Sequence, residues 1–361
     1  MSRTIGILTS GGDCAGLNAA IRAVVTRAVM GYGWSVKGIR YATQGLMTRP
    51  VDAFNLGPRS MDGQMLQIGG TILGTVNTGN PFAWPRDDGY TIDRSAEVIE
   101  GLMLLGLDGL IAVGGDGSLR IMHRLMKMAD LPFIAIPKTV DNDVQATDRA
   151  IGFESAVSVA TSACDSLRSG AMSQRRIMIL EVMGREAGHI ALATGIAGGA
   201  DAILIPEIPV SLERVAQAIQ ERCQREDRDW ALVVVAEAVR REDGRLVSHG
   251  VVGDNPHYGG ISSYIAERLS ALTGRVARAM VLGHLQRGDR PNAADRLIAS
   301  SLGVAAVDLL AAHKRDRMVA WQKGEVVDVP LDEAAGEPRL VDPQGSLVTM
   351  ARGLGICFGD C

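Results

Sequence analysis

Short apolar runs alternate with segments of helical spacing along most of the chain. The apolar runs predict strands over residues 4–8, 35–39, 109–113, 133–136, 177–182, 202–205, 230–236 and 279–282. Helical spacing of apolar positions predicts helices over residues 97–105, 120–128, 153–167, 190–197, 211–223, 261–272 and 295–310. This alternation is typical of parallel sheets, so we expect an α/β fold of two doubly wound lobes with mainly parallel sheets.

The pattern weakens after His313. Two further short strands are predicted over 318–321 and 325–329, and a polar tail rich in Gly, Pro and Asp follows. The sequence suggests no function for the tail, residues 331–361.

Two similar glycine turns each end a predicted strand and begin a helix. They are Gly11-Gly12-Asp13 and Gly114-Gly115-Asp116. A turn without Cβ atoms lets backbone N–H groups approach phosphate oxygens, and the following helix N-terminus favours an anion. Either turn alone is also what an ordinary tight connection between strand and helix looks like.

A third polar segment follows the predicted strand 133–136. Residues 134–143 read I-A-I-P-K-T-V-D-N-D, in which Pro137 ends the apolar run and a lysine, a threonine and two aspartates follow. Phosphoryl transfer uses these groups: a cation and a hydroxyl for phosphate oxygens, and carboxylates for a proton or Mg²⁺. A polar turn explains this decapeptide equally well, because Pro and Asn-Asp also mark turns. In a doubly wound sheet, all three polar segments would lie at the carboxyl ends of strands, where ligands bind.

Composition narrows the possible functions. The formal net charge of −4 provides no basic surface for nucleic acid, so an anionic ligand must be bound by local Arg and Lys residues. Five scattered cysteines without a C-x-x-C pair argue against disulfides or zinc and favour a reducing cytoplasm. No apolar run reaches the roughly 18 residues of a membrane span, and the N-terminus lacks a signal-peptide core, so no membrane partner is expected.

Known phosphate-binding motifs are missing, but a different set of motifs is present. Neither G-x-x-x-x-G-K-[ST] nor a G-x-G-x-x-G after the first strand occurs. Five strings do occur in order over nearly 300 residues: G-G-D-C-A-G-L-N-A-A-I-R, G-G-D-G-S, P-K-T-V-D-N-D, E-V-M-G-R and V-L-G-H-L-Q-R-G. In these strings the chain resembles the 6-phosphofructokinase family.

The resemblance implies an ATP-dependent kinase that phosphorylates the 1-hydroxyl of fructose 6-phosphate in glycolysis, with Mg²⁺. By that resemblance, Asp141 is the general base, Thr139 contacts the transferring phosphate, and Asp116 and Asp143 hold Mg²⁺. It also assigns four residues to the nucleotide phosphates: Gly12, Gly115, Gly117 and Ser118.

The resemblance also implies the residues that bind the sugar. Arg278, His284 and Arg287 correspond to the cluster for the 6-phosphate, which suits the planar guanidinium fork of arginine. The loop Met183, Gly184 and Arg185 would surround the sugar together with Thr139, Asp141 and Glu237. Arg176 corresponds to an arginine that the family donates from a neighbouring subunit, so a homodimer or homotetramer is expected.

The same resemblance suggests which substrate each lobe binds. Residues 1–151 and about 288–330 would form the lobe for ATP and Mg²⁺, and residues 152–287 the lobe for the sugar phosphate. A different kinase with a Gly-Gly-Asp-Gly turn, such as an NAD or lipid kinase, is one alternative. A non-catalytic regulator that binds sugar phosphates is another.

Departures from the family pattern concern the phosphoryl donor. Pyrophosphate-dependent members tend to have Asp at the position of Gly117 and Lys at that of Lys138, and this chain has one feature of each type. Asn77 stands where an arginine usually bridges donor and acceptor. We expect ATP as the donor, with pyrophosphate as the alternative, and our hypothesis is that Lys138 supplies the missing charge.

Two further positions bear on regulation. Arg22 and Arg168 correspond to arginines of the bacterial effector site, but Thr26 stands where another arginine is expected, so allosteric control stays open. Cys14 lies in the first glycine turn, where a thiol near a helix N-terminus could act as a redox switch. A buried, inert thiol is the expected alternative.

Overall fold

The computed structural model describes residues 2–252, 255–334 and 336–360. It divides into two compact units. Unit 1 comprises residues 1–139, 144–155 and 287–337, and unit 2 comprises residues 140–143, 156–286 and 338–361. The sequence analysis placed residues 140–143 in the first lobe, whereas the structure assigns them to unit 2. The tail, residues 331–361, is divided between the two units after residue 337.

Unit 1 is built on an eight-stranded sheet with the order β16-β15-β7-β6-β1-β2-β3, in which β8 pairs with β7. Its strands are β1 (Thr4–Ser10), β2 (Ser35–Ile39), β3 (Ala53–Leu56), β6 (Gly109–Gly114), β7 (Phe133–Thr139), β8 (Ile151–Gly152), β15 (Arg317–Gln322) and β16 (Glu325–Pro330). The pairings are parallel except β2 with β3 and β15 with β16. A separate small hairpin pairs β4 (Trp84–Pro85) with β5 (Thr91–Ile92).

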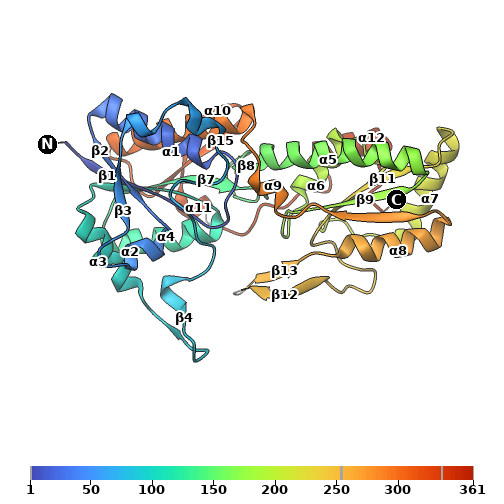
Figure 1. The fold of residues 1–361 in the computed structure, drawn as a ribbon, viewed down its shortest axis with the longest axis horizontal. Helices are drawn as coiled ribbons and strands as arrows, with labels where there is room; N and C mark the ends of the chain where they lie inside the picture. Colours follow the sequence, from blue (N-terminus) through green and yellow to red (C-terminus); the bar gives the residue numbers. More distant parts are fainter. Residues whose placement is uncertain (1, 253–254, 335, 361) are drawn as a thin grey trace. The chain divides into compact units, whose positions relative to one another are not determined.

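Helices cover both faces of this sheet. On one face α1 and α10 pack together, and on the other α3 packs against both α2 and α4 (Figure 1). The helices are α1 (Leu17–Thr26), α2 (Thr43–Met47), α3 (Ser95–Leu105), α4 (Asp116–Ala129), α10 (Ala293–Ala311) and the short α11 (Leu331–Ala334). Strand β6 is buried along its whole length, as expected for a central strand between two helical layers.

Unit 2 has a smaller parallel sheet in the order β10-β11-β9-β14 and an antiparallel hairpin. The strands are β9 (Ile177–Val182), β10 (Ala202–Leu204), β11 (Ala231–Ala236), β14 (Ala277–Val281) and the hairpin strands β12 (Ser248–Val252) and β13 (Asn255–Tyr258). The helices are α5 (Phe153–Gln174), which begins in unit 1, α6 (His189–Ala197), α7 (Leu212–Arg225), α8 (Ile261–Thr273), α9 (Leu285–Gly288), which ends in unit 1, and α12 (Ser346–Gly353). The predicted doubly wound α/β architecture with mainly parallel sheets is confirmed.

Buried carboxylates fix the starts of two long helices, α5 and α8. Asp295, fully buried, accepts hydrogen bonds from the N–H groups of Gly152 (2.9 Å) and Ser155 (2.7 Å) at the start of α5. Glu181 likewise accepts from Gly260 and Ser262, both at 2.8 Å, at the start of α8. Each carboxylate satisfies N–H groups that have no partner within the helix and complements the helix dipole.

The polar segment after β7 begins later than the sequence predicts. Strand β7 does not stop before Pro137 but continues through Lys138 to Thr139, both of which are buried. Pro137 lies between the residues that pair with β15 and those that pair with β8, where its missing N–H interrupts neither pairing. Lys138 and Thr139, both candidate catalytic residues, therefore lie on a strand rather than on a loop.

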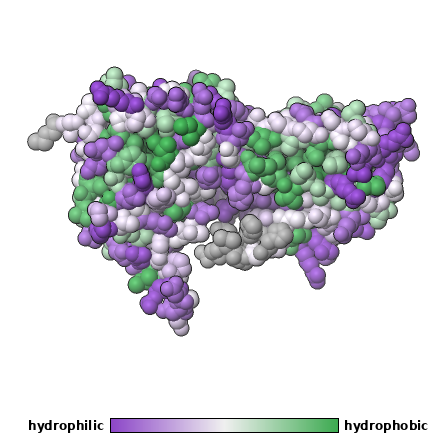
Figure 2. All heavy atoms as spheres, viewed as in Figure 1, coloured by the Kyte–Doolittle hydropathy of each residue, from purple (hydrophilic) through white to green (hydrophobic). Residues whose placement is uncertain are grey.

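None of the helices in the described residues is long and apolar enough to cross a membrane. Polar and apolar residues are intermixed over the visible face of each unit (Figure 2).

Candidate active site

Three strand ends meet at one edge of the unit 1 sheet. Ser10 of β1 pairs with Gly114 of β6, which pairs with Pro137 of β7. The first glycine turn follows β1 directly, and Gly11 there adopts a left-handed φ of 86° that favours glycine. As predicted from the sequence, both glycine turns and the polar segment after β7 begin at the carboxyl ends of adjacent parallel strands.

Lys138 holds the first glycine turn in place. Its Nζ donates to the carbonyl oxygen of Gly12, and the side chain is only 3% exposed. The segment that contains Asn77 packs against the same turn, because Gly11 N donates to Val76 O at 2.8 Å. The lysine and the asparagine named in the donor hypothesis therefore both belong to the surroundings of this turn.

The second glycine turn opens α4. Gly115 is the N-cap residue, Asp116 is the first helical residue, and Asp116 forms an ion pair with Arg120 one turn later. Ser118 faces the first glycine turn, since its Oγ lies 2.9 Å from where a Cβ on Gly11 would stand. A Cβ on Gly117 would meet no atom within 4 Å, so the space beside this glycine is open.

Arg287 belongs to unit 1, beside the first glycine turn. Its Nη1 donates to Asp13 O at 2.9 Å and lies 2.9 Å from where a Cβ on Gly12 would stand. Arg278 and His284, its expected companions at the sugar phosphate, belong to unit 2. Sequence order alone therefore did not reveal that Arg287 lies next to a predicted nucleotide-binding glycine.

Cys14 is fully buried, and burial raises the pKa of its thiol to about 12. Its Sγ lies 3.4 Å from Ile151 O. A thiol that is both inaccessible and protonated is unreactive, which favours the inert alternative over a redox switch. Cys164, Cys223 and Cys357 are also buried, and Cys361 lies outside the described residues.

In unit 2, the predicted sugar loop and Glu237 lie together. Met183, Gly184 and Arg185 follow β9, and Glu237 follows the adjacent parallel strand β11. The carboxylate of Glu237 accepts from the backbone N–H of Arg185 at 3.0 Å. Burial raises the pKa of Glu237 to about 7 against the opposing effect of this hydrogen bond, and the negative charge of Asp141 adds to the rise.

The predicted base, Asp141, and one of the two predicted metal residues, Asp143, lie in the short connection after β7. Thr139 is the last residue of the strand, and Asp141 is 4% exposed. Asn142 has a left-handed φ of 54°, which a non-glycine residue adopts only when its surroundings hold it there. Its carbonyl oxygen and that of Asp143 both bind Arg339 of the tail, at 2.7 Å each.

Two predicted sugar-phosphate arginines lie at the opposite end of the unit 2 sheet. Arg176 immediately precedes β9, and Arg278 pairs with Met178 near the start of that strand. Five residues of strand from Met178 to Met183 span about 16 Å. Within one unit, Arg176 and Arg278 are therefore not brought to the sugar loop, whereas His284 follows β14 at the same end as that loop.

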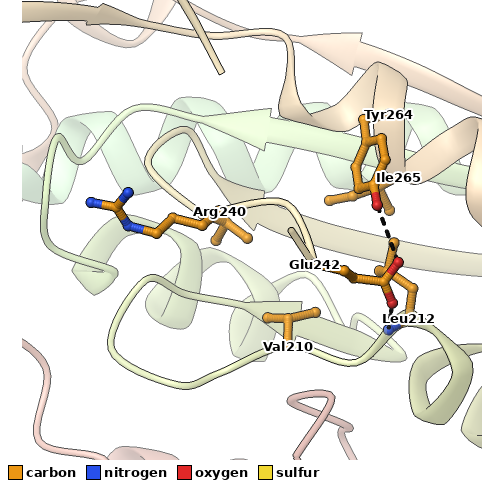
Figure 3. Close-up of a pocket in the computed structure, with 7 residues that line it drawn as sticks. Val210, Leu212, Arg240, Glu242, Tyr264 and Ile265 are labelled. Atoms are coloured by element: carbon orange, nitrogen blue, oxygen red, sulfur yellow. Dashed lines mark hydrogen bonds between the residues drawn. The ribbon is translucent and has the colours of Figure 1, made fainter. Parts of the chain in front are cut away.

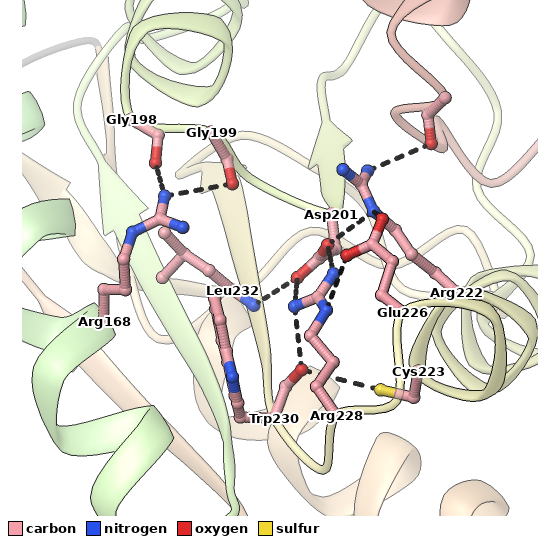
Figure 4. A network of polar contacts seen from close by, with 11 residues as sticks. Arg168, Gly198, Gly199, Asp201, Arg222, Cys223, Glu226, Arg228, Trp230 and Leu232 are labelled. Atoms are coloured by element: carbon pink, nitrogen blue, oxygen red, sulfur yellow. Dashed lines mark hydrogen bonds and ion pairs between the residues drawn. The ribbon is translucent and has the colours of Figure 1, made fainter.

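The arginines that correspond to an effector site bind other parts of the chain. Arg168 Nη2 donates to the carbonyl oxygens of Gly198 and Gly199 (Figure 4). Beside it, Asp201 forms ion pairs with Arg228 and Arg222 and accepts from Leu232 N at 2.8 Å. In unit 1, Arg22 Nε donates to Asp62 O at 3.1 Å. Both arginines thus bind backbone carbonyl groups of their own unit.

A hollow elsewhere in unit 2 contains none of the predicted site residues. It is lined by Val210, Leu212, Val239, Arg240, Glu242, Tyr264 and Ile265. The carboxylate of Glu242 accepts from Leu212 N and from Tyr264 Oη, both at 3.1 Å (Figure 3). It also pairs with Arg268 at 3.2 Å, so these contacts join the segments around α7 and α8 rather than mark a binding site.

Sequence reasoning missed the contribution of the tail to this site. Arg339, His189 and Glu207 bring residues 338–341 against the connection 140–143 and the start of α6. No motif or periodicity in the tail indicates these contacts, because they consist largely of bonds to backbone groups.

Comparison with known proteins gives a consistent result. The sequence model of the family Phosphofructokinase matches residues 4–310. The protein named ATP-dependent 6-phosphofructokinase 1 from Synechocystis sp. is 52% identical, and the match covers 99% of both chains. The crystal structure of Pichia pastoris phosphofructokinase in the T-state is 29% identical with a TM-score of 0.79, and the match covers 98% of this chain but only 37% of that one. A pyrophosphate-dependent phosphofructokinase from Nitrosospira multiformis is 21% identical with a TM-score of 0.80, covering 98% of this chain and 91% of the other, and shows the fold alone.

Proposed function

Because the chain belongs to the phosphofructokinase family, we propose that it is an ATP-dependent 6-phosphofructokinase. It transfers the γ-phosphoryl group of ATP to the 1-hydroxyl of fructose 6-phosphate and yields fructose 1,6-bisphosphate and ADP. The observation that carries this proposal is the nearly full-length match to relatives named for this activity. The chain also has the expected base Asp141, the threonine Thr139 and the aspartates Asp116 and Asp143, whereas Asn77 departs from the usual arginine.

Asp141 is the proposed general base. It removes the proton of the 1-hydroxyl as that oxygen forms a bond to the γ-phosphorus, while the bond from the γ-phosphorus to the bridging oxygen of ADP breaks. Thr139 donates its hydroxyl to the transferring phosphoryl group. Thr139 is the last residue of the buried strand β7, and Asp141 follows two residues later, which supports this assignment.

The glycine turns of unit 1 are the proposed nucleotide site. Backbone N–H groups at Gly12 and Gly115 and the start of α4 face the phosphates, with Ser118 beside them. The open space at Gly117 supports ATP, because a side chain there would compete with the α-phosphate.

Mg²⁺ fits the residues available. No group of three or more potential metal-binding side chains occurs in the described parts of the chain. Mg²⁺ needs no such group, since it is usually held by one or two carboxylates together with water and substrate phosphates. Asp116 and Asp143 supply carboxylates of this kind, and the bound ion would neutralise charge on the phosphates.

Chelation of Mg²⁺ with EDTA should abolish kinase activity in the coupled assay, and added Mg²⁺ should restore it.

Arg176 and Arg278 support an oligomer. Both lie at the amino end of the unit 2 sheet, away from the sugar loop of the same subunit, so they would reach the 6-phosphate of a neighbouring subunit. We therefore propose a homodimer or homotetramer. A fully active monomer in analytical ultracentrifugation would contradict this.

The acceptor can be tested directly. Purified protein with ATP and Mg²⁺ should convert fructose 6-phosphate to the bisphosphate in a coupled assay, and NAD should not be phosphorylated. Turnover of NAD without turnover of fructose 6-phosphate would favour a different kinase. Binding of the sugar phosphate without turnover would favour a non-catalytic regulator.

Glu237 should make sugar binding depend on pH. Burial raises the pKa of its carboxyl to about 7, and the ionised form is the stronger acceptor of hydrogen bonds from sugar hydroxyls. We therefore expect the KM for fructose 6-phosphate to fall as pH rises from 6 to 8, and Glu237→Gln to raise KM about tenfold at pH 8. Ionisation of the substrate phosphate affects both proteins and cancels in the ratio of their KM values. A ratio that does not change with pH would contradict this role.

A further inference from the structure

The connection that contains Asp141 is held by one residue of the tail. Arg339 Nη2 donates to Asn142 O at 2.7 Å, and Arg339 N donates to Asp143 O at 2.7 Å. These carbonyl groups belong to the two residues that follow Asp141. The first comes from a residue with a left-handed φ of 54°, which must be stabilised from outside the connection. Two bonds from a single residue thus fix the backbone directly after the proposed base.

Arg339 is itself anchored from a second direction. Its carbonyl oxygen lies 2.9 Å from His189 Nε2, and since a carbonyl can only accept, the histidine donates. His189 is the first residue of α6. Two residues further along the tail, Val341 N donates to Glu207 Oε1 at 2.9 Å, and the same oxygen accepts from Gly188 N at 2.9 Å. The tail is therefore bound to the N-terminus of α6 on one side and to the connection 140–143 on the other.

The remaining tail contacts make this part of unit 2 a continuous structure. Helix α12 packs against α6, and Cys357 N and O bond to the backbone of Asp201 and Ile203. Residues 338–361 are thus part of the unit 2 fold rather than an appendage. An arginine carried by such a segment can impose a fixed geometry on what it binds.

We propose that Arg339 is a positioning residue for phosphoryl transfer, which clamps the connection 140–143 so that the Asp141 carboxylate faces the acceptor hydroxyl. The inference rests on the proposed function, because it presupposes that Asp141 is the base. Arg339 does not touch substrate in this role. It acts on the backbone, and its loss displaces the carboxylate, where a shift of about 1 Å can cost about a hundredfold in rate.

The test compares two substitutions of the same kind in the same tail. Arg339→Met keeps the aliphatic part of the side chain but removes the donor to Asn142 O. Arg352→Met is the control, because Arg352 lies on α12 and pairs with Asp360 at 2.6 Å, remote in the tail sequence from the contacts to 140–143. Each variant is measured for kcat, for both KM values, for its melting temperature, and for hydrogen exchange in peptides that cover residues 140–143.

We expect Arg339→Met to lower kcat by about tenfold to a hundredfold and to change both KM values less than threefold. Exchange in 140–143 should become several-fold faster, and Arg339→Lys, which keeps a cationic donor, should recover part of kcat. Arg352→Met should leave kcat and exchange in 140–143 unchanged. If Arg339→Met does not fold, Arg339→Gln takes its place, since its amide is too short to reach the same carbonyl group.

Wild-type kcat and exchange in a folded Arg339 variant would overturn the inference, as would an equal loss of kcat in the Arg352 control. Failure of the proposed function looks different. In that case the wild-type protein itself does not phosphorylate fructose 6-phosphate, and the exchange comparison still reports whether Arg339 holds the connection.

Discussion

Asp141→Asn is expected to lower kcat by about 10³-fold and to leave the KM for ATP within a few-fold of wild type. The reason is that the amide has almost the shape of the carboxylate but cannot take a proton, and loss of a general base costs about 10²-fold to 10⁴-fold. The residue is nearly buried at the end of β7, so solvent cannot easily substitute for it. Steady-state kinetics with saturating ATP and fructose 6-phosphate measure the effect.

Asp130→Asn provides the control, because this exposed carboxylate lies at the C-cap of α4 and pairs with the surface residue Arg315. The control should keep wild-type kcat.

A second measurement on Asp141→Asn is the pH dependence of sugar binding through Glu237. Because the charge of Asp141 helps to raise the pKa of Glu237, Asp141→Asn should shift the pH dependence of sugar binding to lower pH. A kcat above one tenth of wild type in folded Asp141→Asn would exclude a base at this position.

Lys138→Met is expected to lower kcat by about 10²-fold to 10³-fold, the cost of removing one donor that stabilises developing charge. Lys138 Nζ binds the carbonyl oxygen of Gly12, and Asn77 follows the residue that binds Gly11. Lys138 is thus a cation at the turn against which the segment of Asn77 packs, and the family usually has an arginine at the position of Asn77. Methionine keeps the length of the side chain and removes its charge.

The combination Lys138→Met with Asn77→Arg sharpens this test. If Lys138 replaces the missing arginine, the added arginine should restore part of kcat to the double variant. Lys127→Met on the exposed part of α4 is the matched control. It should leave kcat unchanged, because the ion pair between Lys127 and Asp332 is at the surface. A kcat of Lys138→Met within a few-fold of wild type, with an unchanged melting temperature, would show that the charge is not needed.

Much of the fold could be predicted from local patterns. Strands 35–39 and 177–182 have the predicted boundaries, because apolar side chains and flanking polar residues both mark their ends. Ser211 is the N-cap of α7 as predicted, and its Oγ accepts from Arg214 N. Where the prediction was wrong, a longer-range interaction decided the outcome. Proline normally ends a strand, but two different partner strands allow β7 to continue through Pro137.

The site was predictable only where motifs carry it. The ordered strings placed the glycine turns and the sugar loop after predicted strands, and Glu237 was placed by the predicted strand 230–236 that precedes it. The sequence also showed that Arg176 precedes the predicted strand 177–182. Because the loop 183–185 follows that strand, Arg176 had to lie a full strand length away from the loop. The role of Arg339 was not visible in the sequence, because a polar tail without periodicity gives no sign of which backbone carbonyl groups it binds.

The identity of the phosphoryl donor is the most direct test of the account. Initial rates of fructose 1,6-bisphosphate formation should be measured on one preparation with Mg²⁺, fructose 6-phosphate and either ATP or pyrophosphate at equal concentrations. We predict turnover with ATP and at least a hundredfold lower kcat/KM with pyrophosphate, since Gly117 leaves open space beside the nucleotide turn. Equal or faster turnover with pyrophosphate would contradict the proposed function.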